Sequence, residues 1–175
     1  IWFNGKNVAW KDAKVHVLNH SLHYGSAVFE GIRCYKTPRG PAVFRLSEHM
    51  ARLIKSCESY EIPSPYSAKE FIDATIELIK ENKIDSCYIR PLVFYGYGHM
   101  GLNPKGAKVD AIIACWPWGT YLGEEGLENG INAKVSKWRR IHASTLPMQA
   151  KCSGNYANSI LGKLDAVNNG FDEAI

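Results

Sequence analysis

The most constraining feature of the sequence is a change in its hydrophobic pattern between residues 27 and 118. Segments 27–35 and 41–45 are rich in strand-forming residues and flank the turn sequence Thr-Pro-Arg-Gly, which predicts an antiparallel strand pair. From Ser47 the apolar residues recur at helical spacing instead. Segments 87–97 and 109–118 then return to a strand-like composition. An antiparallel sheet that buries one face against two helices is an α+β plan.

Local signals indicate where two of these elements begin. Asn4-Gly5 separates two short apolar runs, and this dipeptide suits both central positions of a type I′ turn, so we expect a β-hairpin at the start of the chain. Ser67 is followed three residues later by Glu70, which is the pattern of a capping box. We therefore expect the second amphipathic helix to begin directly after Ser67.

Glycines divide the chain into two parts. Segment 119–130 contains four glycines and little periodicity, so we interpret it as a connector between a small α+β domain, residues 1–118, and a second domain that begins at residue 131. A strand is expected over 131–138 and a helix over 155–168, followed by Gly170. One face of that helix is expected to hold the apolar residues Ile160, Leu161, Leu164 and Val167. Residues 131–175 are too few for a core of their own, so we expect the chain to be a fragment of a longer protein.

Composition excludes several classes of protein. The chain of 175 residues is 46% hydrophobic and carries a formal charge of +4 with acids and bases interspersed, which gives nucleic acid no basic stripe. Its longest apolar run, 111–118, is far shorter than a membrane span, and its N-terminus lacks the pattern of a signal peptide. The five cysteines are widely spaced, which indicates reduced thiols and a cytoplasmic location. His20 and His23 lack a third ligand at a suitable spacing, so no metal site is predicted.

Lys151 is the strongest candidate for chemistry. It lies in a segment of small residues, from Ala150 to Gly154, where folding alone gives no reason for a lysine. A lysine that forms a Schiff base needs a rigid position and neighbours small enough to admit a planar cofactor. A solvated loop lysine is the alternative, and for any single lysine it is the commoner case.

Two further sites contain an arginine whose side chain is suited to bind an anionic ligand. Arg52 lies inside the first amphipathic helix, off its apolar positions, where a guanidinium can hold a phosphate or simply be exposed. Tyr88 and Arg90 share one face of a strand and are suited to a carboxylate, unless they form a solvent-exposed pair at the edge of the sheet. Segments 21–25 and 29–33 combine glycines with aromatic residues typical of a pocket wall.

Four separated motifs occur in one order along the chain. They are Phe-Glu-Gly-Ile-Arg-Cys-Tyr at 29–35, Tyr-Ile-Arg-Pro at 88–91, Pro-Trp-Gly-Thr-Tyr-Leu-Gly at 117–123 and Ala-Lys-Cys-Ser-Gly-Asn-Tyr at 150–156. Together they closely resemble the branched-chain amino acid aminotransferases, which are pyridoxal-phosphate enzymes of fold type IV. The resemblance extends over all 175 residues, and it implies that the second domain is the beginning of a larger α/β-barrel-like domain.

The resemblance implies a role for individual residues. Lys151 resembles the lysine that forms the Schiff base with pyridoxal 5'-phosphate, and Arg52 resembles the arginine that grips its phosphate. Tyr156 is similar to the tyrosine that hydrogen-bonds the cofactor's 3′-oxygen. The residues that resemble the wall of the substrate side-chain pocket are Tyr24, Phe29, Gly31, Trp118 and Tyr121.

The same resemblance implies the reaction and the assembly. It implies transamination of leucine, isoleucine and valine with 2-oxoglutarate, with Tyr88 and Arg90 admitting the side-chain carboxylate of glutamate. Tyr24 and the Gly101-Leu102 loop reach a neighbouring subunit's site in the family, which implies a homodimer or a larger even assembly. No nucleic acid or membrane partner is implied.

Alternatives remain open at this point. D-amino acid aminotransferase and aminodeoxychorismate lyase share the lysine and the phosphate arginine, although the motifs at 29–35 and 88–91 disfavour them. In the family, a glutamate that pairs with the pyridine nitrogen lies beyond residue 175, so we expect the 175-residue chain alone to be inactive. A non-catalytic fragment that dimerises or binds partners is the alternative from another class.

Overall fold

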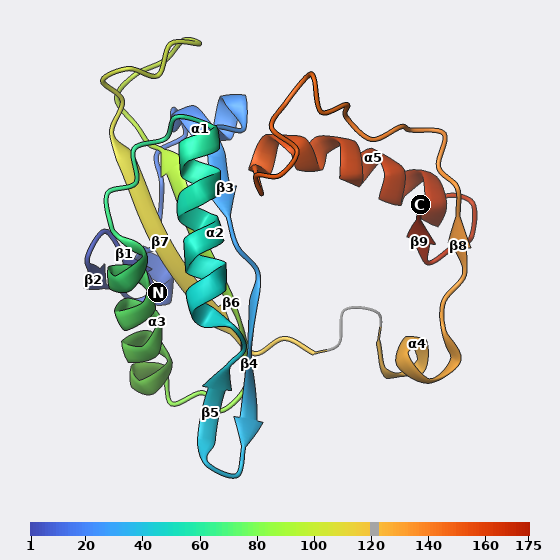
Figure 1. Cartoon of the computed structure of the whole chain (residues 1–175), viewed down its shortest axis with the longest axis horizontal. Coiled ribbons are helices and arrows are strands. Elements are labelled where there is room, and N and C mark those ends of the chain that lie inside the picture. Colours follow the sequence, from blue (N-terminus) through green and yellow to red (C-terminus); the bar gives the residue numbers. More distant parts are fainter. Residues whose placement is uncertain (120–122) are drawn as a thin grey trace. The chain divides into compact units, whose positions relative to one another are not determined.

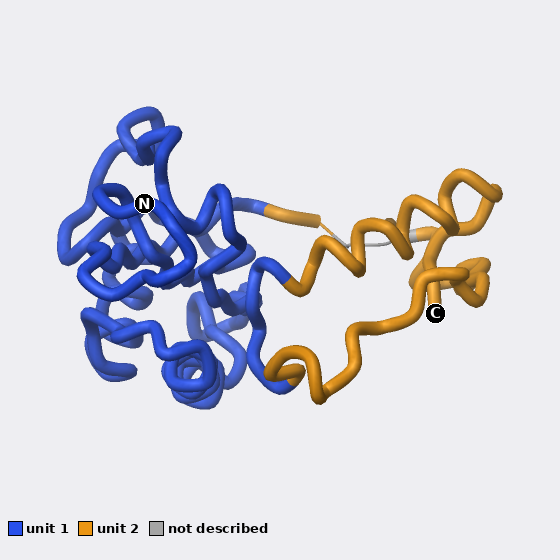
Figure 2. The backbone as a smooth tube through the Cα atoms, turned by 90° about the horizontal axis from the view of Figure 1, so that it is seen from above, with its two compact units in different colours: residues 1–117, 149–154 blue, residues 118–148, 155–175 orange. Residues whose placement is uncertain are grey.

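The computed structural model describes residues 1–119 and 123–175. The contacts between Cα atoms divide the chain into two compact units (Figure 2): unit 1 comprises residues 1–117 and 149–154, and unit 2 comprises residues 118–148 and 155–175. The chain therefore leaves unit 1, returns to it for six residues that include Lys151, and leaves again. The domain bounds 1–118, 119–130 and 131–175 remain predictions about the full-length protein.

Unit 1 is built on one antiparallel sheet of seven strands. Strand β6 lies at its centre and pairs with β7, β4 and β3, while β1 extends the sheet beyond β7 and β5 extends it beyond β4. This confirms the predicted α+β plan. The strands are β1 Trp2–Phe3, β2 Lys6–Asn7, β3 Ala27–Phe29, β4 Ile32–Thr37, β5 Gly40–Val43, β6 Cys87–Tyr95 and β7 Val109–Trp116.

The predicted turns and one unpredicted break shape the strands. Asn4 and Gly5 both have positive φ, +48° and +89°, as a type I′ turn requires, so the N-terminal hairpin is confirmed. Residues 27–35 do not form one strand as expected, because the pairing is interrupted at Glu30 and Gly31. The side chain of Glu30 is fully buried and bonded to a helix, which gives this break a structural role.

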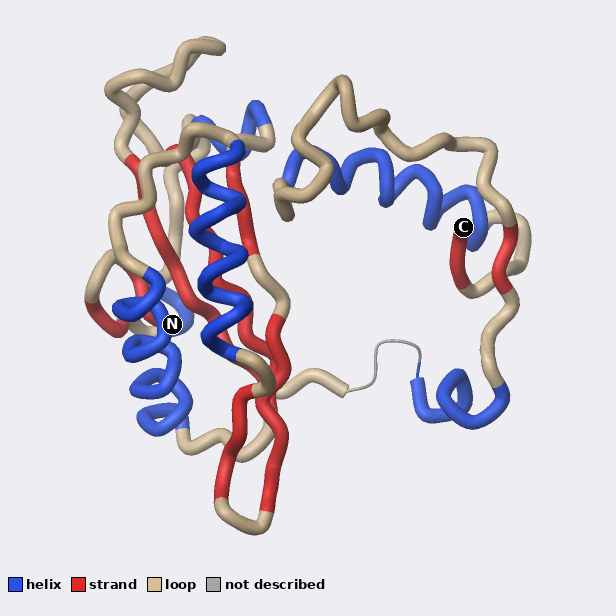
Figure 3. Tube along the Cα trace, in the orientation of Figure 1, coloured by secondary structure: helices blue, strands red, loops and turns tan. Residues whose placement is uncertain are grey.

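Two long helices cover one side of this sheet (Figures 1 and 3). They are α2, Leu46–Ser59, and α3, Ala68–Asn82, and they follow the short helices η1, Trp10–Asp12, and α1, His20–Tyr24. The capping box is confirmed, since the Ser67 hydroxyl accepts a bond from the Glu70 N–H and the Glu70 carboxylate accepts one from the Ser67 N–H. None of the described helices is long and apolar enough to cross a membrane.

The core of unit 1 lies between these helices and the sheet. Alternate residues of β6 face it, including Cys87, Ile89 and Val93, so the residues between them, Tyr88 and Arg90, face the other side of the sheet. The five cysteines are all buried and free. The large apolar side chains that α2 and α3 bury completely include Met50, Leu53, Phe71 and Leu78.

Unit 2 contains little sheet. Helix α4, Gly123–Asn129, lies in the segment interpreted as a connector, and the strand expected over 131–138 is reduced to β8, Ala133–Lys134, which pairs in parallel with β9, Glu173–Ala174. Helix α5, Tyr156–Val167, follows the short helix η2, Ser153–Asn155, and matches the predicted helix. Its apolar residues Ile160, Leu161, Leu164 and Val167 are exposed, whereas its buried residues are Gly162 and Ala166.

Candidate active site

The main chain around Lys151 is fixed to both layers of unit 1. The Phe29 N–H donates to the Lys151 carbonyl at 3.0 Å, and Val28 forms an isolated antiparallel bridge with Cys152. The Lys151 N–H donates to the Ser56 hydroxyl of α2 at 3.2 Å. Lys151 therefore lies on a rigid segment that joins β3 to α2, as a nucleophilic lysine requires and a solvated loop lysine does not.

The small residues around Lys151 are explained by packing. A Cβ on Gly25 would lie 2.7 Å from the Gly154 Cα, so the two main chains approach too closely for any side chain at Gly25, whose φ is also positive. Ala150 and Cys152 are buried, and the Cys152 thiol belongs to the core. The sequence interpretation assigned these residues to clearance for a cofactor; the structure adds that Ala150, Cys152 and Gly154 also pack the lysine segment against the rest of unit 1.

The ring of Phe29 is in contact with two cationic side chains. The Lys151 Nζ lies 4.7 Å from its centroid and the Arg90 Cζ lies 4.5 Å from it. Both distances are within the range of cation–π attraction. Lys151 and Arg90, which are far apart in the sequence, are thus brought to one aromatic residue.

Tyr88 and Arg90 form the predicted pair on the central strand. The Arg90 Nη2 donates to the Tyr88 hydroxyl at 3.0 Å, and the Arg90 Nε is buried with no hydrogen-bond partner within the described parts of the chain. The alternative of a pair at the sheet edge is wrong, because β6 is paired on both sides. A Cβ on Gly31 would lie 2.1 Å from the Tyr88 hydroxyl, so only glycine fits beside this phenol.

Arg52 is tied to a carboxylate that the sequence interpretation did not single out. Its Nε and Nη2 donate to the two oxygens of Glu30 at 2.5 and 2.7 Å, which is a bidentate pair. The His49 Nδ1 lies 2.9 Å from one of the same oxygens. Glu30 has no exposed side-chain surface, whereas 53% of the Arg52 side chain is exposed. Arg52 is therefore anchored to a buried carboxylate while about half of its side-chain surface stays exposed.

The charge on Glu30 is stabilised in this setting. Burial by itself raises the pKa of the carboxyl, but the hydrogen bonds and positive charge of Arg52 and His49 outweigh burial, so the pKa of Glu30 lies below its ordinary value. Glu30 is therefore a buried carboxylate that is ionised and paired at neutral pH.

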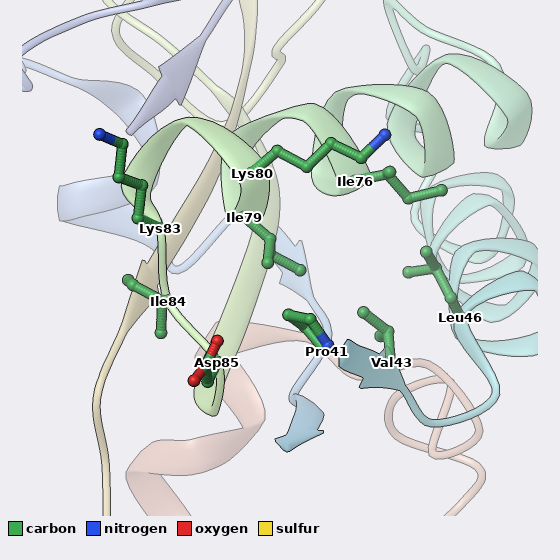
Figure 4. Close-up of a pocket in the computed structure, with 9 residues that line it drawn as sticks. All are labelled: Pro41, Val43, Leu46, Ile76, Ile79, Lys80, Lys83, Ile84 and Asp85. Carbon is green, nitrogen blue, oxygen red and sulfur yellow. The ribbon is translucent and has the colours of Figure 1, made fainter. Parts of the chain in front are cut away.

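Two cavities of unit 1 differ in chemistry. A small cavity of about 240 Å³ is lined by Arg45, Glu48, His49 and Arg52. A larger one of about 590 Å³ lies between α3, β5 and the start of α2 (Figure 4), with an apolar lining that includes Val43, Leu46 and Ile79 and charged residues that include Lys80. The larger cavity contains none of the predicted site residues, so its size does not make it the candidate site.

The predicted site residues are divided between the two units of the chain. Tyr156 and Trp118 belong to unit 2, and Tyr121 lies outside the described residues. Tyr24 and Leu102 belong to unit 1 and are 43% and 85% exposed. Unit 1 also contains the other predicted site residues, which are Lys151, Arg52, Phe29, Gly31, Tyr88 and Arg90.

His20 and His23 each have polar partners within unit 1. His20 is buried, and its two ring nitrogens lie 2.7 Å from the Ser26 hydroxyl and 2.8 Å from the Gly101 carbonyl. The His23 Nε2 lies 2.8 Å from the Val17 carbonyl. Both are partnered side chains, and His20 connects α1 to the loop that carries Leu102.

Comparison with known proteins assigns the chain to a class. A model of the amino-transferase class IV family matches residues 27–175. The chain belongs to this family, and the resemblance drawn from its motifs is confirmed.

The particular relatives are branched-chain-amino-acid aminotransferases. The Escherichia coli K12 protein of that name is 51% identical over the whole chain, which covers 57% of the relative's length. The crystal structure of the E. coli enzyme superimposes with a TM-score of 0.97 at 51% identity, over 99% of this chain and 58% of that one. A T.th. enzyme of the same name, complexed with N-(5'-phosphopyridoxyl)-L-glutamate, gives a TM-score of 0.92 at 42% identity, over 99% and 57%. The chain thus spans somewhat more than half the length of these relatives.

Proposed function

We propose that the full-length protein is a pyridoxal-phosphate-dependent transaminase that exchanges amino groups between branched-chain L-amino acids and 2-oxoglutarate. The E. coli relative named branched-chain-amino-acid aminotransferase is identical to this chain at about half of its positions, 51%. One similar structure contains a phosphopyridoxyl group joined to glutamate, which supports both the cofactor and the acceptor.

One observation carries the proposal: the main chain of Lys151 is bonded to the helix that carries Arg52. The Ser56 hydroxyl, which accepts the hydrogen bond from the Lys151 N–H, lies four residues after Arg52 on α2, which is roughly one helical turn or about 6 Å along the axis. Residues four apart lie on the same face of a helix. The main chain that carries the Lys151 amine is thus held about one helical turn from Arg52 within unit 1.

This donor set fits pyridoxal phosphate. The amine suits the aldehyde of the cofactor, and the half-exposed guanidinium suits its phosphate. The ring of Phe29 lies beside the amine and offers an apolar surface at the same place. When bound, pyridoxal phosphate supplies an electron sink for the bond that breaks at the substrate Cα.

Each of these site residues then has a proposed role. Lys151 would hold the cofactor through its Nζ and would also move the proton at the substrate Cα. Arg52 binds and orients the phosphate. Tyr156 is proposed as the hydrogen-bond partner of the cofactor's 3′-oxygen on the family resemblance alone, because it belongs to unit 2.

The substrate pocket is proposed to accept two kinds of side chain. Phe29 offers apolar surface for leucine, isoleucine and valine, and the resemblance adds Trp118 and Tyr121 to this wall. Tyr88 and the buried Nε of Arg90 offer polar groups for the side-chain carboxylate of glutamate. Gly31 keeps the space that the Tyr88 hydroxyl occupies.

We also infer an even homo-oligomer that works in the cytoplasm. The exposure of Tyr24 and Leu102 leaves both side chains accessible to a second subunit. The five free thiols suit a reducing compartment.

An assay of amino-donor specificity tests the function. The full-length protein with pyridoxal phosphate should form glutamate from 2-oxoglutarate with L-leucine, L-isoleucine or L-valine as the donor. Turnover of D-alanine in place of these donors would instead identify a D-amino acid aminotransferase, and release of pyruvate from aminodeoxychorismate would identify a lyase. Absence of all three activities, with no bound cofactor, would leave a non-catalytic module.

A further inference from the structure

Glu30 occupies an unusual position for a charged residue. It lies between β3 and β4 in an apolar run, its side chain has no exposed surface, and its N–H donates to the Pro91 carbonyl of the central strand. A buried carboxylate is retained only when its charge is compensated. Here the compensation comes from α2, through Arg52 and His49.

The geometry of this contact leaves one side of Arg52 directed away from Glu30. A guanidinium has five N–H groups in a planar fork. Glu30 receives the Nε–H and one Nη2–H, so the remaining N–H groups are not used by this carboxylate. An exposed arginine without such an anchor samples many rotamers and loses that freedom when it binds a ligand.

We propose that Glu30 is a positioning residue that holds the Arg52 guanidinium in the orientation that receives the phosphate of the cofactor. This inference rests on the proposed binding of pyridoxal phosphate and adds a residue to it. Glu30 itself does not touch the phosphate, because two anions in contact repel each other. Its effect is to fix the arginine before the ligand arrives, which reduces the entropic cost of binding.

Two effects of opposite sign make the proposal testable. Replacing Glu30 by glutamine removes a negative charge near the phosphate, which by charge alone would strengthen phosphate binding. The same change breaks the bidentate pair and releases the guanidinium, which weakens binding. The proposal requires the second effect to prevail.

The experiment compares two ligands that differ only in the phosphate. Equilibrium binding of pyridoxal phosphate and of pyridoxal is measured by absorbance for the full-length wild type, E30Q and the control E48Q. Glu48 lies on the same helix as Arg52 and its replacement removes the same charge, but it is exposed and pairs with Arg45. We expect E30Q to bind pyridoxal phosphate about fivefold to tenfold more weakly, with pyridoxal affinity unchanged, whereas E48Q, which removes the same charge without breaking the bidentate pair, should show no loss of affinity for either ligand.

Other results would overturn the proposal. An equal loss of affinity for both ligands would show a general structural effect, and unchanged or tighter binding of pyridoxal phosphate to E30Q would show that charge prevails. If the wild type binds neither ligand, the proposed function fails together with the inference. If the wild type binds and E30Q does not differ from it, the inference alone fails.

A measurement on the wild type covers the case in which E30Q does not fold. With ¹⁵N-labelled arginine, the Arg52 Nε–H signal, assigned with R52K, should exchange slowly with water in the cofactor-free protein. The more conservative variant E30D should show faster exchange together with weaker binding of pyridoxal phosphate. Fast exchange in the cofactor-free wild type would show that Arg52 is not fixed in advance and would overturn the proposal.

Discussion

Lys151 and Phe29 contact each other twice: the Phe29 N–H donates to the Lys151 carbonyl at 3.0 Å, and the Lys151 Nζ lies 4.7 Å from the centre of the Phe29 ring. The first contact fixes the main chain of the lysine, and the second places its amine beside an apolar surface. One residue of β3 therefore contacts both the main chain of Lys151 and its side-chain amine.

Lys151 should be the lysine that reacts with pyridoxal phosphate. After borohydride reduction of the full-length protein with the cofactor, peptide mass spectrometry should locate a pyridoxyl adduct on Lys151. Lys137 is a matched control, because its Nζ also lies near an aromatic ring, 5.8 Å from the centre of Trp138, and it should stay unmodified. Lys151→Ala should lose the adduct and about 10²–10⁴-fold in turnover, which is the usual contribution of a proton-transfer group. Equal labelling of both lysines would contradict the assignment.

Gly31→Ala should impair the reaction with glutamate more than that with leucine. The added Cβ would lie 2.1 Å from the Tyr88 hydroxyl and would displace it from Arg90, so we expect the KM for glutamate to rise about tenfold. In the double variant G31A/Y88F the hydroxyl is absent and the nearest ring carbon lies 3.1 Å from the new Cβ. Steady-state kinetics should then show recovery with leucine without recovery with glutamate. Parallel recovery with both substrates would exclude a role for the phenol in specificity.

Gly25→Ala should weaken cofactor attachment through the position of Gly154. The new Cβ would lie 2.7 Å from the Gly154 Cα, and a main chain cannot move aside as a flexible side chain does. Gly40→Ala is the control, since Gly40 also has a positive φ but has nothing within 4 Å of the added Cβ. Denaturant titration should show a loss of about 1–2 kcal/mol for each variant from backbone strain, with a further loss for Gly25→Ala. Reduced labelling of Lys151 in Gly25→Ala alone is the expected result, and equal labelling in both variants would show that this contact does not position the lysine.

Stability at low pH should depend on Glu30. Because pairing with Arg52 and His49 lowers the pKa of Glu30 in the folded protein, its contribution to the free energy of unfolding is present above the ordinary value of 4.5 and is lost as the pH falls through the lowered folded value. Urea titrations across this range should therefore give a steeper loss of stability for the wild type than for E30Q. E48Q should behave nearly as the wild type, because an exposed ion pair contributes little. Identical pH profiles for the wild type and E30Q would contradict the pairing.

The fold of unit 1 could be predicted because its signals are local. Asn4-Gly5 specifies its own turn, and the Ser67 hydroxyl and Glu70 carboxylate cap their own helix within four residues. The alternation along β6 likewise specified that Tyr88 and Arg90 share a face. The exposed apolar face of α5 was not predicted, because the pattern of a helix shows which residues are apolar but not what covers them.

Sequence patterns singled out candidate site residues only where one short motif contained both the reactive group and its unusual neighbours. Lys151 stood out as a lysine among small residues, but Glu30 was passed over although a carboxylate between Phe29 and Gly31 in an apolar run requires a buried partner. Arg52 lies 22 positions from Glu30, and no local pattern connects the two. The role of Ser56 in holding Lys151 could not be predicted for the same reason, since 95 positions separate them.

The return of residues 149–154 to unit 1 has a consequence for the order in which the protein is assembled. The Cys152 thiol donates to the Gly25 carbonyl across 127 positions, whereas all seven strands of the sheet and the two covering helices precede residue 117. Contacts so distant in sequence form late, and chains fold from their N-terminus during synthesis. During synthesis the residues that bring Arg52 beside Glu30 are therefore made before Lys151, so the lysine segment joins unit 1 only after the sheet and the two covering helices have been synthesised.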